Sequence, residues 1–181
     1  MGRILGLGGY KESGKDAFAE ALPQDEWVVL GMSDPLLEAS RVMNPFLRDV
    51  GMTVREWEEA CSGSYAAMKA NSSEYRGFLQ RMGTEFGRDM IDENVWVNIA
   101  KGTIESILAK GKSAAVTGIR FPNEIAAIRS LGGELAWVER DGVVSPRDLH
   151  SSETSVSPKD FDKIIKNDAT LDELRAQARN Y

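Results

Sequence analysis

The stretch Gly9-Tyr10-Lys11-Glu12-Ser13-Gly14-Lys15-Asp16 follows a short apolar segment, residues 4–7, and precedes apolar residues at helical spacing. This order predicts a strand, a glycine-bounded loop and a helix, with the pattern G-x-x-x-x-G-K across the junction. In such a loop the backbone N–H groups point at one spot, and the helix dipole favours negative charge there. Gly9 and Gly14 permit torsions and a close approach that a Cβ would prevent. Lys15 can reach the β- and γ-phosphates of a nucleotide, so the stretch predicts a phosphate-binding loop.

The last position of this pattern is unusual, because Asp16 stands where a Ser or Thr hydroxyl normally binds Mg²⁺. A carboxylate about 4 Å from a phosphate is repelled by about 4 kcal/mol per unit charge at an effective dielectric constant of roughly 20. A hard cation between the two groups offsets this repulsion. Asp16 therefore either helps to hold Mg²⁺ or turns away and caps the helix. The alternative for the whole stretch is a glycine-rich turn with a surface lysine and no nucleotide.

The composition is that of a globular domain with an acidic charge balance. The chain has 181 residues, of which 42% are hydrophobic and 28% are charged, and this is enough for one domain with a full core. The net charge is −6 and no basic stripe is present, which disfavours nucleic acid as a partner. The single Cys61 excludes an internal disulfide and fits a reducing compartment. No long apolar run is visible and the N-terminus is strand-like, so we expect no membrane partner and a cytoplasmic location.

Five short apolar runs predict strands, and the amphipathic segments between them predict helices. The predicted strands cover residues 3–8, 27–30, 113–117, 135–138 and 163–166. The predicted helices cover residues 14–21, 33–43, 75–86, 94–110, 123–131 and 171–179. Strands that alternate with helices predict an α/β fold, with a mostly parallel five-stranded sheet and helices on both faces. Ligands of such sheets bind beyond the carboxyl ends of the strands, where loops begin at Gly9, Gly31, Gly118, Glu139 and Asn167.

Two segments are less regular than the rest. In residues 44–74, Thr53 and Glu56 form a capping box that predicts a short helix carrying Trp57. This helical excursion either merely covers the sheet or forms a mobile flap over a substrate pocket, and we expect the flap. Residues 140–160 are polar and contain glycine and prolines, so they predict a long loop or lid.

Short segments follow one another along the chain in a specific order. They are Gly14-Lys15-Asp16, Ser33-Asp34-Pro35-Leu36, residues 76–85 (RGFLQRMGTE), Trp96-Val97, residues 120–124 (RFPNE), Gly132-Gly133, Val138-Glu139-Arg140, residues 150–153 (HSSE) and Asn167-Asp168. In this order and spacing they resemble the motifs of the phage-type deoxynucleoside monophosphate kinases, members of the P-loop kinase superfamily. The resemblance covers most of the chain. It implies a single P-loop kinase domain over residues 1–181, a three-layer sandwich with a helical substrate-binding flap (44–74) and a lid loop (140–160).

The same resemblance implies an activity. It is the transfer of the γ-phosphoryl group of ATP, with Mg²⁺, to the 5′-phosphate of a deoxynucleoside monophosphate. Because the acceptor is already an oxyanion, catalysis needs positioning and charge neutralisation more than a strong general base. The resemblance also implies small-molecule partners, a homodimer and action in the cytoplasm of an infected host. Two alternatives remain open: another small-molecule P-loop kinase, similar to phosphomevalonate kinase, and a nucleotide-binding module without transfer activity.

The residues expected at the site fall into three groups. The donor nucleotide and its loop would use Gly9, Lys11, Ser13, Gly14, Lys15, Asp16, Ala17, Arg140, Asn167 and Asp168, with Asp16 as the metal ligand. The acceptor would use Asp34, Trp57, Arg76, Arg88, Arg120, Glu124, His150 and Glu153. The transfer step would use Lys15, Arg120 and Arg76 as catalytic cations. Arg120 follows the third strand and can clamp a phosphate through two parallel hydrogen bonds; its structural alternative is an ion pair with Glu124 or Asp34.

Two positions depart from the pattern that the resemblance implies. Gly118 stands where family members usually carry an Asp, two positions before the arginine, and Leu37 stands where they often carry a Lys. An acid at the end of the third strand would help to organise Mg²⁺, so its absence leaves Asp16 as the remaining carboxylate. The same absence is the one feature that favours a module without transfer activity.

Overall fold

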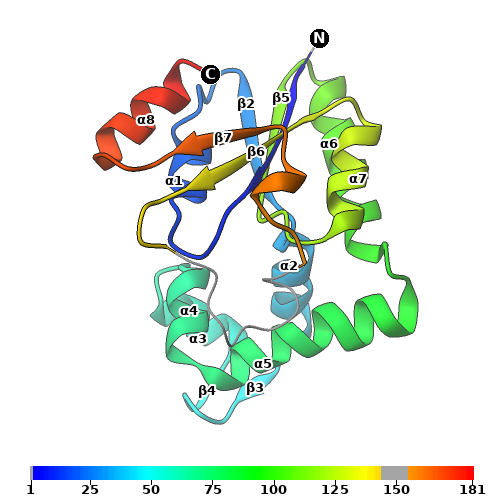
Figure 1. Cartoon of the computed structure of the whole chain (residues 1–181). Coiled ribbons are helices and arrows are strands. Elements are labelled where there is room, and N and C mark those ends of the chain that lie inside the picture. The colour runs from blue at the N-terminus through cyan, green and yellow to red at the C-terminus, as the bar shows by residue number, and fades with distance from the viewer. Residues whose placement is uncertain (1, 144–154) are drawn as a thin grey trace. The chain divides into compact units, whose positions relative to one another are not determined.

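Five short strands pair in parallel and form one sheet (Figure 1). They are β1 (Ile4–Gly8), β2 (Trp27–Gly31), β5 (Ser113–Thr117), β6 (Glu134–Glu139) and β7 (Lys163–Lys166), in the spatial order β2-β5-β1-β6-β7. All the residues of β1 are buried, because this strand lies at the centre of the sheet. Continuous burial of this kind is typical of a parallel sheet that is covered on both faces. The predicted five-stranded parallel sheet is confirmed.

The computed structural model describes residues 2–143 and 155–181. The chain divides into two compact units, one made of Met1–Met32 and Ala100–Tyr181 and the other of Ser33–Ile99. The first unit contains the sheet, and the second is mostly helical. None of the helices in the described ranges combines the length and the apolar character that crossing a bilayer requires.

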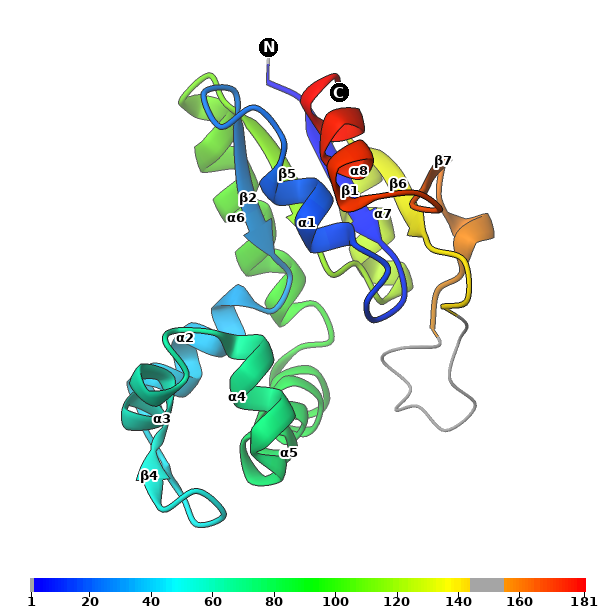
Figure 2. The same cartoon turned by 90° about the vertical axis from the view of Figure 1, so that its left-hand side faces the viewer.

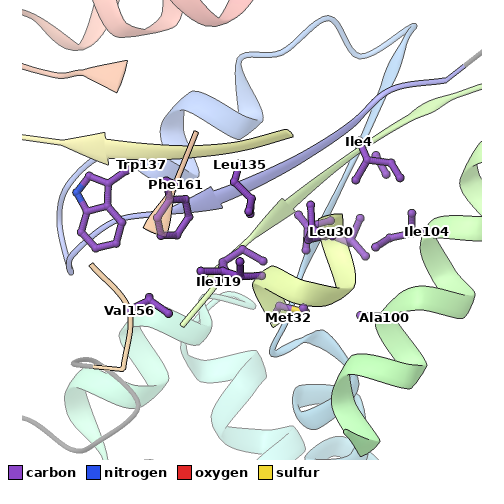
Figure 3. Close-up of a cluster of buried hydrophobic side chains, with 14 of the residues drawn as sticks. Ile4, Leu30, Met32, Ala100, Ile104, Ile119, Leu135, Trp137, Val156 and Phe161 are labelled. Atoms are coloured by element: carbon purple, nitrogen blue, oxygen red, sulfur yellow. The ribbon is translucent and has the colours of Figure 1, made fainter. Parts of the chain in front are cut away.

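Helices cover both faces of the sheet in the first unit. On one face α1 (Lys15–Glu20) and α8 (Leu171–Arg179) pack against Leu5 and Leu7 of β1; both helices lie in front of the sheet in Figure 2. On the other face, α7 (Pro122–Ser130) and the end of α6 (Val95–Ala109) pack against a cluster that includes Ile4 (Figure 3). A short 3₁₀ helix, η3 (Pro158–Asp160), precedes β7. The three-layer arrangement that the sequence predicts is therefore present.

The second unit has its own core. Its elements are α2 (Asp34–Met43), the paired strands β3 (Phe46–Leu47) and β4 (Met52–Thr53), α3 (Val54–Ala60), α4 (Tyr65–Asn71), α5 (Ser73–Arg81), the π-helix η1 (Met82–Ile91) and the first turn of α6. Its hydrophobic core is formed by Leu37, Leu47, Val54, Met68, Tyr75, Leu79 and Met82. The capping box predicted at Thr53 is confirmed, with the Glu56 carboxylate accepting a hydrogen bond from the Thr53 backbone N–H. The sequence pattern predicts neither the β3-β4 hairpin nor α4.

The helix predicted over residues 75–86 continues to Ile91, but as a π-helix after Arg81. Trp96 packs against this segment: its Nε1 donates a hydrogen bond to the Gly83 carbonyl at 2.8 Å. The indole lies so close to Gly87 that a Cβ added there would be 2.6 Å from ring atoms. Long π-helical segments are rare and often occur at functional sites.

Two carboxylates connect the β3-β4 hairpin to the start of α5. The Asp49 carboxylate accepts hydrogen bonds from the Glu74 backbone N–H at 3.0 Å and from the Ser72 hydroxyl at 2.9 Å. The Glu74 carboxylate accepts a hydrogen bond from the Arg48 backbone N–H at 2.6 Å. In both cases the backbone hydrogen bond is the main cause that holds the pKa of the carboxyl below its usual value. This connection therefore needs both carboxylates to be ionised.

We expect the Asp49→Asn variant to be less stable than the wild type at neutral pH but not at acid pH. The pKa of Asp49 is lowered in the folded state, so its contribution is present above the unfolded-state pKa and is lost as the pH falls through the folded-state value. In urea unfolding, the midpoints of variant and wild type should differ near about pH 7 and converge below about pH 4. Asp25→Asn removes an exposed carboxylate of the first unit and should follow the wild type throughout. A midpoint difference for Asp49→Asn that does not shrink with acid would contradict the prediction.

We expect Gly87→Ala to destabilise the protein by about 1–3 kcal/mol, because the new methyl group must displace the indole of Trp96. Urea unfolding at neutral pH measures this change. The matched control is Gly102→Ala in α6, where an added Cβ meets nothing within 4 Å and helix propensity improves by up to about 1 kcal/mol. Equal stability of Gly87→Ala and the wild type would show that the π-helix does not depend on this close contact.

Candidate functional site

The loop between β1 and α1 is shaped as a cradle of backbone N–H groups. Gly9 has φ +150°, Glu12 has φ +65° and Gly14 has φ +95°, so three residues of the loop have positive φ. Left-handed residues within a loop are typical of an anion-binding nest, in which successive backbone N–H groups point into one concavity. The loop leads directly into the N-terminus of α1, whose dipole adds to the attraction for an anion. The predicted phosphate loop therefore has the backbone geometry that its sequence requires.

The two loop glycines leave no space for a side chain. A Cβ on Gly9 would lie 2.5 Å from the Ser13 Oγ and 2.7 Å from the Val138 carbonyl oxygen. A Cβ on Gly14 would lie 2.5 Å from the Nδ2 of Asn167. The same Nδ2 donates a hydrogen bond to the Ser13 carbonyl at 2.8 Å, so a residue from the end of β7 holds the loop.

The side chains of the loop supply one buried cation and one buried hydroxyl. Lys15 is buried, and its Nζ lies 3.5 Å from the Oδ2 of Asp16, which is exposed. The Ser13 Oγ is buried and has no hydrogen-bond partner among the described residues. A donor without a partner costs about 1–3 kcal/mol, and a bound phosphate oxygen would accept its hydrogen bond. Lys11 is exposed beside Glu12, and Ala17 packs into the core, so Ala17 can offer a ligand only its backbone.

The donor set fits a nucleoside triphosphate with Mg²⁺. Within the described ranges, no group of three or more His, Cys, Asp or Glu side chains is arranged to hold a metal ion. Mg²⁺ commonly binds through one or two carboxylates, substrate phosphates and waters, and does not need an all-protein cage. The exposed carboxylate of Asp16 next to the loop meets this requirement.

A pocket opens beside the loop at the carboxyl ends of the strands. It is lined by Gly9, Tyr10, Lys11, Ile119, Arg120, Trp137 and Val156. Arg120 and the phosphate loop thus border the same pocket, as their places in the sequence predict. The sequence pattern does not single out Tyr10, Ile119, Trp137 or Val156 as pocket residues. Ile119 and Trp137 could have been predicted to lie near a ligand, because both lie near the carboxyl ends of predicted strands.

Glu124 holds the turn that carries Arg120. Its buried carboxylate accepts hydrogen bonds from the backbone N–H groups of Arg120 at 2.7 Å and of Phe121 at 3.1 Å. This contact uses the backbone of Arg120 rather than its guanidinium. Glu124 thereby fixes the start of α7 and the direction in which Arg120 leaves the sheet.

Two more residues expected at the donor site lie near the loop in the first unit. The Arg140 guanidinium donates to the Glu12 carbonyl at 3.4 Å, which brings the end of β6 to the loop. Asp168 is exposed next to Asn167. His150 and Glu153 lie outside the described residues.

The other expected residues belong to the second unit. Arg76 donates two hydrogen bonds to the Lys69 carbonyl, at 2.9 and 3.2 Å, and Arg88 on the π-helix donates to the Glu93 carbonyl at 3.3 Å. The Trp57 Nε1 donates to the Met68 carbonyl at 3.3 Å and its ring packs on the core of this unit. Asp34 lies in the first turn of α2 and is exposed. Trp57 therefore has a structural role within its own unit.

Comparison with known proteins matches a family model over most of the chain. The model of the family described as deoxynucleotide monophosphate kinase matches residues 40–178. This range begins after the phosphate loop, so the loop motif and the family match are separate observations.

Two viral relatives agree with this match. A protein of Acanthamoeba polyphaga mimivirus, to which the same activity is ascribed by name, is 27% identical over 185 residues and covers 96% of this chain and 93% of that protein. The deoxynucleotide monophosphate kinase of Enterobacteria phage T4 is 28% identical over 106 residues, which cover 58% of this chain and only 44% of the phage protein. A solved sugar kinase from Janibacter sp. is 12% identical, with a TM-score of 0.49 over 98% of this chain and 92% of the sugar kinase.

We expect Asn167→Ala to weaken ATP binding about two- to tenfold, because it removes the hydrogen bond that holds the loop at Ser13. Titration calorimetry measures the change. The matched control is Asn180→Ala, which removes an amide hydrogen bond to the Ala176 carbonyl in α8 and should leave ATP affinity unchanged. If the two variants bind ATP equally well, Asn167 does not shape the loop.

Proposed function

The chain belongs to the deoxynucleotide monophosphate kinase family, which makes it a phosphotransferase, and from this premise we propose how its residues carry out the transfer. An oxygen of the acceptor 5′-phosphate attacks the γ-phosphorus of ATP. The new P–O bond forms as the bond from the γ-phosphorus to the β–γ bridging oxygen breaks. ADP and a deoxynucleoside diphosphate leave. No strong base is needed, so positioning and charge neutralisation supply the catalysis.

One observation carries this proposal: the phosphate loop and Arg120 border the same pocket. The loop provides backbone donors and the buried Lys15 for the donor phosphates. Arg120 provides a planar fork of donors that matches a second phosphate. A protein that only binds a nucleotide needs the first of these features but not the second.

On the donor side we propose that the loop N–H groups and the Ser13 hydroxyl bind the β-phosphate. Lys15 stabilises the charge that develops on the bridging and transferring oxygens. Asp16 would hold Mg²⁺ together with the phosphates, and the metal would neutralise charge on the β- and γ-oxygens. Asn167, Asp168 and Arg140 would contact the donor nucleotide at the ends of β7 and β6, with Arg140 already at the loop carbonyl of Glu12.

On the acceptor side we propose that Arg120 clamps the 5′-phosphate, held in place by the hydrogen bonds of Glu124 to its turn. Arg76 and Arg88 would add positive charge to the acceptor or transferring phosphate. Asp34, His150 and Glu153 remain acceptor-site proposals on their motifs alone, and Trp57 remains one on its place in the irregular segment 44–74. The indole N–H of Trp57 already donates to Met68, so any contact of Trp57 with a base would use the ring.

Gly118 is the observation that favours the alternative, a nucleotide-binding module without transfer. It stands where an acid would help to organise Mg²⁺, and it has φ +77°. Another small-molecule acceptor, such as a phosphomevalonate-like compound, would use the same donor loop. Measuring turnover with a panel of acceptors distinguishes these alternatives from the proposed function.

We also propose that the protein is a homodimer and acts in the cytoplasm of an infected host. The relatives from a giant virus and a phage support the second part. Sedimentation equilibrium tests the first, and a monomer at all concentrations would overturn it.

The experiment that tests the proposal is an ADP-release assay with ATP, Mg²⁺ and each deoxy- and ribonucleoside monophosphate in turn. We expect turnover with one or several deoxynucleotides. We further expect Arg120→Ala to lower kcat/KM for the acceptor about 10- to 100-fold, the loss of a charge-assisted hydrogen bond of about 1.5–3 kcal/mol.

The matched control is Arg129→Ala on α7, the helix that follows Arg120; the Arg129 guanidinium pairs with Asp162 at 3.0 Å, and its loss should leave kcat/KM unchanged. An Arg120→Ala variant with wild-type kinetics would overturn the acceptor site. ATP binding without turnover on any nucleotide would favour a different acceptor or the module without transfer.

A further inference from the structure

One buried hydrogen-bond donor belongs to a residue that lines the pocket and is not used by the features described so far. The indole Nε1 of Trp137 is buried and has no hydrogen-bond partner in the described part of the chain. An indole N–H can only donate, and leaving it unsatisfied costs about 1–3 kcal/mol. By contrast, Trp57 and Trp96 both donate to backbone carbonyls. The donor on Trp137 therefore lacks an acceptor among the described residues, and a ligand could supply one.

The position of Trp137 connects this donor to the phosphate loop. Trp137 pairs with Gly8 across β6 and β1, directly before the loop, and its ring meets the ring of Tyr10 edge-on at a centroid distance of 5.0 Å. Phe161 packs against it at 5.1 Å. Figure 3 shows the indole nitrogen on the side of the ring that is turned away from Phe161 and toward the loop after β1. The aromatic neighbours thus fix the ring in one orientation.

The lining of the pocket indicates which ligand would accept this hydrogen bond. Its charged side chains are Lys11 and Arg120, and none of its lining residues is a carboxylate. A pocket with two cations and a free N–H matches an oxyanion, since every one of these groups donates and none of them accepts. Under the proposed function, the oxyanion that Arg120 binds is the acceptor phosphate.

We infer that the Trp137 indole N–H donates a hydrogen bond to the 5′-phosphate of the acceptor nucleotide, beside Arg120. This inference rests on the proposed function. Trp137 is then a substrate-binding residue, and its role is to fix the acceptor oxyanion next to the phosphate loop. A guanidinium alone can clamp a phosphate in several rotations about its long side chain; a second donor on a rigid ring selects one of them.

The chain offers a matched control for this donor. Trp27 also carries a buried Nε1 without a partner in the described residues, but it lies in the cluster formed with α1 and α8 and does not line the pocket. Its ring packs against Tyr181 and under the Arg3 guanidinium. A purely structural role of the indole would therefore affect Trp27 and Trp137 variants alike.

The first experiment observes the N–H directly. The protein with ¹⁵N-labelled tryptophan gives indole N–H signals from four residues, which Trp→Phe variants assign. Titration with each deoxynucleoside monophosphate should shift the Trp137 signal and leave that of Trp27 in place. Titration with inorganic phosphate should shift the same signal, which tests the inference even if the wild type phosphorylates no nucleotide. A Trp137 signal that moves with neither ligand would overturn it.

The second experiment removes only the N–H. Replacing Trp137 with the isosteric benzothienylalanine keeps the ring volume and deletes the donor. We expect the KM for the acceptor to rise about tenfold, the KM for ATP to change less than about twofold, and stability in urea to be unchanged or slightly higher. Trp27→Phe should lower stability and leave both KM values unchanged.

The outcomes distinguish a failure of the Trp137 inference from a failure of the proposed function. If the wild type turns over deoxynucleotides and the isostere has the same acceptor KM, the Trp137 inference is wrong and the proposed function stands. If the wild type turns over none of them, the proposed function fails and the phosphate titration decides about Trp137. If the isostere is less stable and binds the acceptor normally, the N–H has a structural partner such as a buried water, which also overturns the inference.

Discussion

Two close contacts from distant parts of the chain shape the phosphate loop, and the whole site depends on them. The Val138 carbonyl and the Asn167 side chain approach Gly9 and Gly14 more closely than any Cβ would allow. Val138 lies on β6 and Asn167 follows β7, so the loop near the N-terminus takes its shape from the last two strands of the sheet. Because Val138 belongs to the sheet and Asn167 directly follows it, these contacts orient the loop before any ligand binds, which would keep the ordering entropy lost on binding small.

The features that the sequence predicts correctly are those with local causes. Apolar runs, the capping box at Thr53 and the proline at the start of α7 each act within a few residues, and the structure has all of them. The π-helix has no such local cause, because the contact of Trp96 with Gly87 joins residues nine positions apart in sequence and on different helices. The β3-β4 hairpin was missed because its strands have two residues each, too few for any periodicity to show.

At the candidate site, the sequence predicts the phosphate loop and Arg120, but it does not predict the other residues that line the pocket, such as Trp137. Trp137 reads as a core residue from its strand, and it is one: it packs on Phe161 and Tyr10. Its place near the carboxyl end of β6 can be inferred from the sequence, but the missing partner of its Nε1 is a property of the folded surroundings that the sequence does not show. The same holds for Glu124, whose carboxylate could serve a ligand, a helix dipole or the turn until its hydrogen bonds to that turn are known.

The backbone conformation at Gly118 affects which charges the site can carry. At φ +77° an L-residue is strained by about 1–2 kcal/mol, although a Cβ there would meet no atom within 4 Å. The backbone rather than a lack of space therefore opposes an acid at this position. The charged residues that line the pocket are Lys11 and Arg120, both cations, in a chain whose net charge is −6. Under the proposed function, Lys15, Arg120 and the oriented N–H groups would attract two phosphates locally, against a global charge that repels them. A metal held by Asp16 would then offset the repulsion that is greatest where the donor and acceptor phosphates meet.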